Sequence, residues 1–173
     1  DAFTLTAAIE EVSCFGASDG AVDLSVTGGS GGYDFRWSNG EIDEDILGLE
    51  AGAYVVTVTD STGCTASASF LVTQPAPLAL GAVPTPVSCA GEDDGEIDLT
   101  AMGGVGGYSF QWSTGEITED ISGLEAGFYT VMVMDSNGCE ATVIVNVLQP
   151  DSLVLTADVT HESTTGANDG AID

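Results

Sequence analysis

Four cysteines carry the most specific chemistry in this chain. Cys14 and Cys64 lie 50 positions apart, and the same spacing separates Cys89 from Cys139. No two of them have the Cys-x-x-Cys spacing of a zinc ribbon or a thioredoxin-like redox site. We therefore expect two disulfides, Cys14–Cys64 and Cys89–Cys139, each adding roughly 4 kcal/mol to a small domain in the chain-entropy model. The alternative is four buried free thiols. Disulfides would imply an oxidising compartment.

Carboxylates recur in three related phrases, SDGAVD, DDGEID and NDGAID. Ca²⁺ takes roughly six to eight oxygen ligands, which clustered carboxylates and turn carbonyls can supply. The candidate calcium ligands are Asp19, Asp23, Asp94, Asp98, Asp169 and Asp173. Their D-G-x-x-x-D spacing is sparser than that of an EF-hand loop, so the alternative is an Asp-Gly turn followed by a solvated strand residue. No cofactor other than calcium is expected.

The remaining polar residues form no recognisable catalytic set. His161 is the only histidine, and the sequence has no Ser/His/Asp arrangement, phosphate loop or metal triad. Paired carboxylates can serve a glycosidase, but carboxylates that recur in every repeat indicate architecture. We therefore expect this chain not to be an enzyme.

These residues are carried on a tandem repeat. A shift of 75 positions aligns Cys14 with Cys89 and Trp37 with Trp112, without a gap. Thr164 occupies the corresponding position in a third copy, where the cysteine is lost. The repeats occupy residues 1–75, 76–150 and 151–173, the last being truncated. A period of this size predicts a linear array of domains.

Each repeat is predicted to be an all-β domain. AVDLSVTGG alternates apolar and polar residues, and YDFRWS places Tyr33, Phe35 and Trp37 on one face. AYVVTVTDSTGCTASASFLV predicts two strands joined by a tight turn, and Ile42–Leu47 predicts another strand. Short strands with an inward Trp favour an immunoglobulin-like two-sheet sandwich, of either six or seven strands. The linkers TQPAPL and LQPDSL favour a rod over a flexible string.

Two longer runs resemble the SprB-type repeat, namely VSCFGASDGAVDLSVTGGSGGYDFRWSNG and DILGLEAGAYVVTVTDSTGCTASASFLVTQP. The most specific pieces are VSC.G..DG, Y.F.WS.G and GLEAG.Y.V.V.D..GC, and the resemblance extends over essentially the whole chain. Such repeats occur in tandem in very large surface adhesins of Bacteroidota that the type IX secretion system exports. The resemblance implies an immunoglobulin-like sandwich, a stalk or adhesin filament at the cell surface, and no catalysis.

Repeat 2 has apolar residues where repeat 1 has polar or small ones. They are Met102, Phe128, Met132, Met134, Ile144 and Leu148, in place of Thr27, Ala53, Thr57, Thr59, Ser69 and Thr73. An exposed apolar patch usually marks an interface, so we expect copies of the same chain to bundle laterally there. The alternatives are a β-bulge that exchanges the two faces and a neighbouring domain that covers the patch.

The formal net charge is −27, and Arg36 is the only basic residue apart from histidine. Such a chain repels nucleic acid and anionic lipid, and no apolar run approaches the roughly 20 residues of a membrane span. High salt or bound divalent cations would relieve its self-repulsion.

We therefore expect an extracellular stalk segment of a secreted cell-surface adhesin or filament. Its adhesive tip, which would contact glycans or cells, would lie outside this chain. Such a stalk would be compatible with gliding motility, prey capture or attachment. The alternative function is a calcium-dependent glycan- or ligand-binding module.

Overall fold

The computed structural model describes residues 3–161, 163–168 and 170–172. The regular secondary structure of this part of the chain is entirely β-strand, and it contains no helix that could cross a membrane. The strands of domain 1 are β1 (Thr4–Glu10), β2 (Gly20–Thr27), β3 (Asp34–Trp37), β4 (Ile46–Leu49), β5 (Gly52–Thr59) and β6 (Thr65–Val72). Those of domain 2 are β7 (Ala79–Thr85), β8 (Gly95–Met102), β9 (Ser109–Trp112), β10 (Ile121–Leu124), β11 (Gly127–Met134) and β12 (Glu140–Val147). Two short strands follow, β13 (Val159–Thr160) and β14 (Ala171–Ile172).

Each domain is a sandwich of two three-stranded sheets. In domain 1 a sheet of order β1-β2-β4 faces a sheet of order β3-β5-β6, and in domain 2 the sheets are β10-β8-β7 and β12-β11-β9. All paired strands are antiparallel. The predicted tandem all-β sandwiches are confirmed, and each has six strands.

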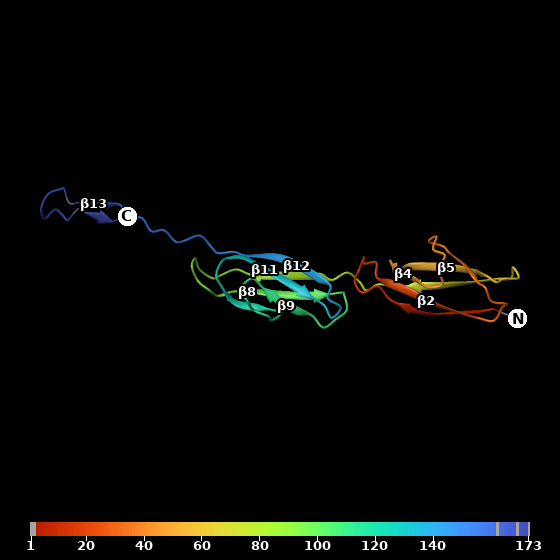
Figure 1. Ribbon diagram of the computed structural model, residues 1–173. Coiled ribbons are helices and arrows are strands. Elements are labelled where there is room, and N and C mark those ends of the chain that lie inside the picture. Colours follow the sequence, from red (N-terminus) through yellow and green to blue (C-terminus); the bar gives the residue numbers. More distant parts are fainter. Residues whose placement is uncertain (1–2, 162, 169, 173) are drawn as a thin grey trace.

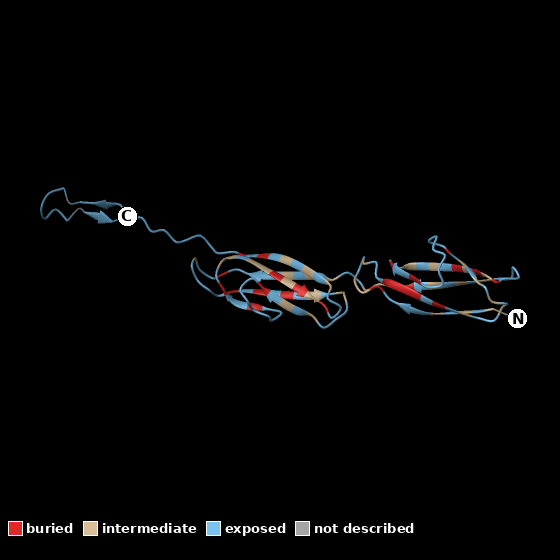
Figure 2. Cartoon of the chain, in the orientation of Figure 1, coloured by how far each residue is buried: buried red, intermediate tan, exposed pale blue. Residues whose placement is uncertain are grey.

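A tryptophan lies in the core of each sandwich. Trp37 and Trp112 are buried, and each indole N–H donates to a loop carbonyl at 2.9 Å, that of Asp43 or Thr118. Around Trp37 pack the inward residues of both sheets, as the alternating pattern predicts. The buried apolar residues form a band through each domain, with exposed residues outside (Figure 2). Each domain therefore has its own hydrophobic core.

The predicted strand at Ile42–Leu47 begins too early. The strand observed is β4, and residues 42–45 form a loop in which Ile42 is exposed. This loop is held by specific hydrogen bonds: the Asp43 carbonyl accepts the Trp37 indole, and an Asp45 carboxylate oxygen accepts the Leu24 N–H at 2.9 Å. At this loop the chain crosses from the β3 sheet to the β1-β2-β4 sheet.

The two domains follow one another end to end (Figure 1). Between β1 and β2 lies the cysteine loop (residues 11–19), whose Val12 N–H donates to the Thr73 carbonyl at 2.9 Å, just after β6. The cysteine loop therefore lies at the end of domain 1 that leads into domain 2. The hairpin turn (residues 135–139 in domain 2) joins β11 to β12. A cysteine loop also occurs at residues 86–94, and a hairpin turn at residues 60–64.

Beyond domain 2 the chain begins the same pattern again. Val159 pairs with Ile172 and Thr160 with Ala171, in the register that pairs Pro84 with Ile97 one repeat earlier. This third segment extends away from domain 2 (Figure 1).

Candidate functional site: a disulfide across the domain junction

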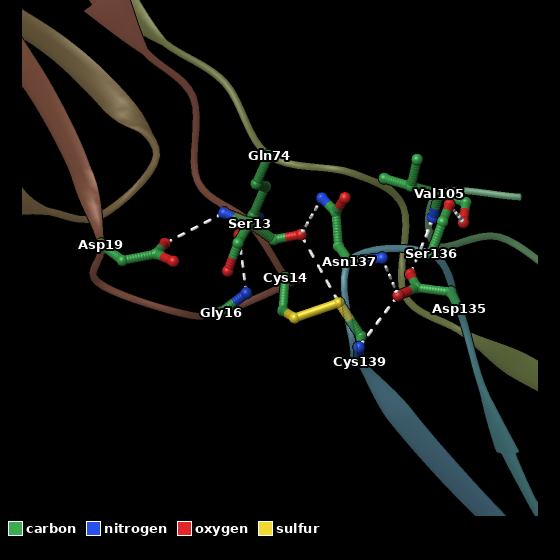
Figure 3. The surroundings of a disulfide bond; sticks show 10 residues. All are labelled: Ser13, Cys14, Gly16, Asp19, Gln74, Val105, Asp135, Ser136, Asn137 and Cys139. Atoms are coloured by element: carbon green, nitrogen blue, oxygen red, sulfur yellow. Dashed lines mark hydrogen bonds between the residues drawn. A yellow bond between two sulfur atoms is a disulfide. The ribbon is translucent and has the colours of Figure 1, made fainter.

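A disulfide joins the two domains. It links Cys14, in the cysteine loop of domain 1, to Cys139, in the hairpin turn of domain 2, with 5.7 Å between the Cα atoms (Figure 3). The two residues are 125 positions apart. The expectation of a disulfide is therefore right for these two cysteines, but both predicted pairings, Cys14–Cys64 and Cys89–Cys139, are wrong.

The predicted pairings fail because the two cysteines of one domain lie at opposite ends of it. Cys64 stands just before the first residue of β6, whereas the cysteine loop that carries Cys14 is bonded through Val12 to Thr73, just after the last. Eight strand residues at about 3.3 Å each separate these levels by roughly 26 Å. A disulfide needs Cα atoms about 4.4–6.8 Å apart, so no pair within a domain can close.

The cysteine loop is fixed by hydrogen bonds to its own backbone. An Asp19 carboxylate oxygen accepts the Ser13 N–H at 3.0 Å, and the Gln74 amide oxygen accepts the Gly16 N–H at 2.7 Å. Hydrogen bonds from the Ser13 side chain and then its backbone hold the pKa of Asp19 below its usual value. Cys14 is therefore presented from an ordered loop that is tied to the linker.

The hairpin turn is organised by a buried carboxylate, Asp135. One of its oxygens accepts the N–H groups of Asn137 and Cys139 at 2.9 Å each, and the other accepts the Val105 N–H at 2.8 Å. These backbone hydrogen bonds, that of Val105 first, lower the pKa of Asp135. The carboxylate thus fixes the backbone of Cys139 and ties the turn to the β8–β9 loop.

Two further contacts brace the junction. The Asn137 side-chain amide donates to the Ser13 carbonyl at 2.9 Å, across the two domains (Figure 3). The Gly104 N–H donates to the linker carbonyl of Ala76 at 2.8 Å. The adjacent Gly103 has φ +78°, and a Cβ there would stand 2.1 Å from the Pro77 carbonyl oxygen, so the linker can approach only a glycine.

The other two cysteines are free and exposed. Cys64 lies in the hairpin turn of domain 1, and Cys89 lies in the cysteine loop of domain 2. Thr164 closes its loop through an Ala167 N–H to Thr164 carbonyl bond of 3.0 Å, as Cys14 does with Ala17 at 3.1 Å. Thr164 thus stands at the position of Cys14 in a loop of the same closure, without a thiol.

Sequence reasoning missed the residues that position the cysteines. Asp135 and its equivalent Asp60 lie four residues before a cysteine, in DSNGC and DSTGC, and Gln74 and Gln149 precede the linker prolines. Their recurrence at the 75-residue shift was the available signal. Asn137 has no such signal, because repeat 1 has Thr62 at its position.

The candidate calcium ligands are not brought together. Asp19 and Asp94 accept N–H groups of their own loops, and the described residues contain no group of three or more acidic, His or Cys side chains placed to hold a metal ion. Asp23 and Asp98 are exposed on β2 and β8. Asp169 and Asp173 lie outside the described residues. Calcium binding stays a prediction.

The predicted apolar patch divides between two sheets. Phe128, Met132 and Met134 all lie on the outer face of β11. Ile144, on the neighbouring strand β12, and Leu148, just after it, lie on the same face. Phe128 and Ile144 are 76% and 66% exposed, whereas Met132 and Met134 are half-buried. Met102 is exposed on the opposite sheet. We name the patch on β11 and β12 without Met102 the outer apolar face; its role as an interface stays a prediction.

Domain 1 also exposes apolar residues on the equivalent face. Val55 and Leu71 point outward on β5 and β6 and are 43% and 59% exposed. The two domains therefore differ less than the substituted positions alone suggest.

A model of the SprB repeat matches residues 6–41 and 81–124. The chain carries two SprB repeats. The matched stretches include Cys14 and Cys89 but end before the hairpin turns with Cys64 and Cys139. SprB repeats belong to surface adhesins, and no catalytic family is indicated for this chain. No sequence among the curated proteins matches it.

A solved structure with tandem domains shares the fold. The three N-terminal domains of the highly immunogenic outer capsid protein Hoc of bacteriophage RB49 align with a TM-score of 0.50 at 20% identity, over 86% of this chain and 59% of that one. The eight N-terminal immunoglobulin domains of Down syndrome cell adhesion molecule, isoform 1.30.30, align with a TM-score of 0.44 at 13% identity, over 86% and 25%. The SprB-repeat chain thus spans less than two thirds of either structure, and the Hoc match supports an immunoglobulin-like fold only.

Proposed function

We propose that this chain is a stalk segment of a secreted cell-surface adhesin or extracellular filament. The disulfide between Cys14 and Cys139 carries this proposal, because it fixes one domain against the next where a string of independent domains would have a flexible linker. The disulfide and the hydrogen bond from the Asn137 amide to Ser13 join the two domains, and the Gly104–Ala76 hydrogen bond ties the linker to domain 2. A held junction is what a spacer needs to keep its length.

The disulfide also changes how tension passes along the chain. A pull on both ends travels from the N-terminal side to Cys14, across the disulfide, and onward from Cys139. The residues between them lie in a closed loop and carry no sustained tension while the bond is intact. A stalk built this way resists lengthening when a cell is pulled.

Compartment and surface charge agree with this role. A structural disulfide persists in oxidising surroundings outside the cell. The net charge of −27 keeps the surface hydrated and repels neighbouring copies at low salt, whereas the salt of an external medium screens that repulsion. Screening lets identical chains approach side by side, through the outer apolar face of domain 2.

The ligand-binding alternative gains no support from the two tryptophans. Trp37 and Trp112 are buried and hydrogen-bonded within the cores, so neither ring offers a surface on which a glycan could stack. We therefore place adhesion outside these two domains and assign them spacing and mechanical strength.

Small-angle X-ray scattering tests the stalk proposal. We expect the oxidised chain to give an interdomain distance distribution as narrow as that of one rigid rod, and the double variant Cys14→Ser/Cys139→Ser to give a broader one. The matched control Cys64→Ser/Cys89→Ser removes the two free thiols and should scatter like the parent. Oxidised chain that scatters as two independently moving domains would refute the proposal.

A further inference from the structure

The junction consists of two half-sites that meet. A hollow of about 490 Å³ between the domains is lined by the cysteine loop of domain 1, through Cys14 and Phe15, and by the linker, through Ala76, Pro77 and Leu78. From domain 2 it is lined by Gly104, Gly138, Cys139 and Glu140. We name the first set the loop half-site and the second the turn half-site.

The far end of domain 2 repeats the loop half-site. A second hollow, of about 380 Å³, is lined by Ser88, Cys89, Ala90, Pro150, Asp151, Ser152 and Leu153. The last six are the 75-residue equivalents of Cys14, Phe15, Pro75, Ala76, Pro77 and Leu78. The supporting bonds recur as well: an Asp94 oxygen accepts the Ser88 N–H at 2.8 Å, and the Gln149 amide oxygen accepts the Gly91 N–H at 3.3 Å.

The opposite end of domain 1 repeats the turn half-site. Asp60 is buried, and one of its oxygens accepts the N–H groups of Thr62 and Cys64 at 2.9 and 3.0 Å. The other accepts the Ser30 N–H at 3.0 Å, as Asp135 does with Val105. Cys64 is thus held in the backbone geometry that in domain 2 presents Cys139 to its partner.

We propose that Cys89 and the loop half-site around it dock the hairpin turn of a further domain of this same fold, joined by a disulfide between Cys89 and the cysteine of that turn. Cys64 is the complementary half of such a junction with a preceding domain. The bond forms when the two thiols lose two protons and two electrons to a disulfide oxidant, which is reduced to two thiols. This inference rests on the proposed stalk function. It extends the one observed disulfide between domains, which we call a staple, to the neighbouring junctions.

Continuity with the established junction identifies the occupant. Leu153 follows Pro150 at the distance at which Leu78 follows Pro75, and β13 then pairs with β14 in the register of the preceding repeats. A domain that starts at this distance after domain 2 places its own hairpin turn beside Cys89, as domain 2 places its turn beside Cys14. Disulfide pairing between each domain and the next therefore needs only the arrangement seen at the Cys14–Cys139 junction.

Successive staples of this kind overlap. Each would close 125 positions while starting 75 positions after the last, so the closed loops share 50 positions. A stalk of interlocked loops cannot lengthen at one domain without loading the next. Repeated at each junction, the disulfide between cysteine loop and hairpin turn would thus stiffen an array of more than two domains.

The test adds one domain to the chain. Residues 76–150 are repeated directly after Pro150, which rebuilds the sequence QPAPL of the observed junction, and each domain has its own core. The extended chain is oxidised in a glutathione buffer, digested, and its disulfides are mapped by mass spectrometry. We expect the Cys14–Cys139 bond and a new bond from Cys89 to the added copy of Cys139, with two thiols left.

Two variants of the extended chain serve as controls. Cys89→Thr copies the residue that the third repeat carries at Thr164, where the loop still closes, so it removes the thiol and keeps the loop. It should leave the added copy of Cys139 as a thiol. Serine at that added cysteine should leave Cys89 as a thiol.

The outcomes separate the two proposals. If Cys89 stays a thiol in the extended chain, or pairs with any other cysteine within or between chains, the inference of a repeating staple is wrong. The Cys14–Cys139 junction, and with it the stalk proposal, would survive that result. Loss of Cys14–Cys139 from the same map would instead refute the stalk proposal.

Discussion

Reduction of the Cys14–Cys139 disulfide should change how far the chain lengthens under force. In the oxidised chain, tension bypasses the closed loop, so only the segments outside it can be drawn out. Before the third repeat these are residues 1–14 and 139–150, about 26 residues. At about 3.6 Å per extended residue their contour is roughly 90 Å. Reduction places both domains in series with the applied force.

The gain on reduction follows from the length of the closed loop. Its 125 positions, at about 3.3–3.6 Å each, correspond to roughly 410–450 Å of contour, against 5.7 Å between the two Cα atoms in the native junction. The gain should come in two steps, because each domain has its own core. Each domain, from its first to its last strand, should release about 200 Å after the length of the folded sandwich is subtracted.

Single-molecule force spectroscopy on the Cys64→Ser/Cys89→Ser background measures this directly. That background leaves one possible disulfide, so pairing cannot be scrambled. Traces in oxidising buffer should lack the two steps of about 200 Å, and addition of a reductant should make them appear. Two such steps in oxidised, non-reduced molecules would show that tension does not bypass the domains and would refute the reasoning.

Four further outcomes follow from the structure. Gly103→Ala should destabilise domain 2 by at least about 1 kcal/mol in chemical denaturation, because an L-residue at φ +78° is strained and its Cβ meets the linker. The control Gly106→Ala, whose Cβ would have open space around it, should lower the free energy of unfolding by less in the same assay. Acid should destabilise domain 1: hydrogen bonds, that of the Thr62 hydroxyl first, lower the pKa of Asp60 from 3.8 to about 2. The stabilisation from this carboxylate is therefore complete above pH 3.8 and is lost as the pH falls through about 2, which a fall in the melting temperature, followed by circular dichroism, would measure. In high salt, light scattering should give a mass of several chains, and Phe128→Ala/Ile144→Ser, which restores the residues of repeat 1, should give a monomer; a monomeric parent would rule out lateral bundling. If the acidic cysteine loops bind calcium, millimolar calcium added after chelation should raise the melting temperature more than magnesium does, and an equal response to the two ions would rule out the calcium site.

Much of the fold could be predicted because its signals are local. Alternation fixes which face of β2 and β5 is buried, and DSTG and DSNG fix the hairpin between the last two strands, where Gly63 has φ +86°. The start of β4 could not be predicted in this way. Residues 41–45 before it are acidic apart from Ile42. The Asp43 carbonyl accepts the Trp37 indole N–H and an Asp45 carboxylate oxygen accepts the Leu24 N–H, and such partners, distant in the sequence, leave no local pattern.

The cysteine pairing could not be read from the spacing for a reason that belongs to repeats. A perfect 75-residue period makes the pair within a repeat and the pair between repeats equally regular, since 50 and 125 differ by one period. The pairing is decided only by the end of the sandwich at which each cysteine lies. If six strands simply alternated in direction, the turns after the first and the fifth would lie at the same end, and Cys14 would meet Cys64.

The actual chain breaks that alternation at one place. β3 is antiparallel to β5 and β4 is antiparallel to β2, while β2 and β5 both run away from the end at which β1 and β6 finish. β3 and β4 therefore run in the same direction, joined by the loop that crosses between the sheets. This single crossing places Cys64 at the opposite end from Cys14. The sheet crossover is therefore what allows the disulfide to join neighbouring domains and not the two ends of one domain.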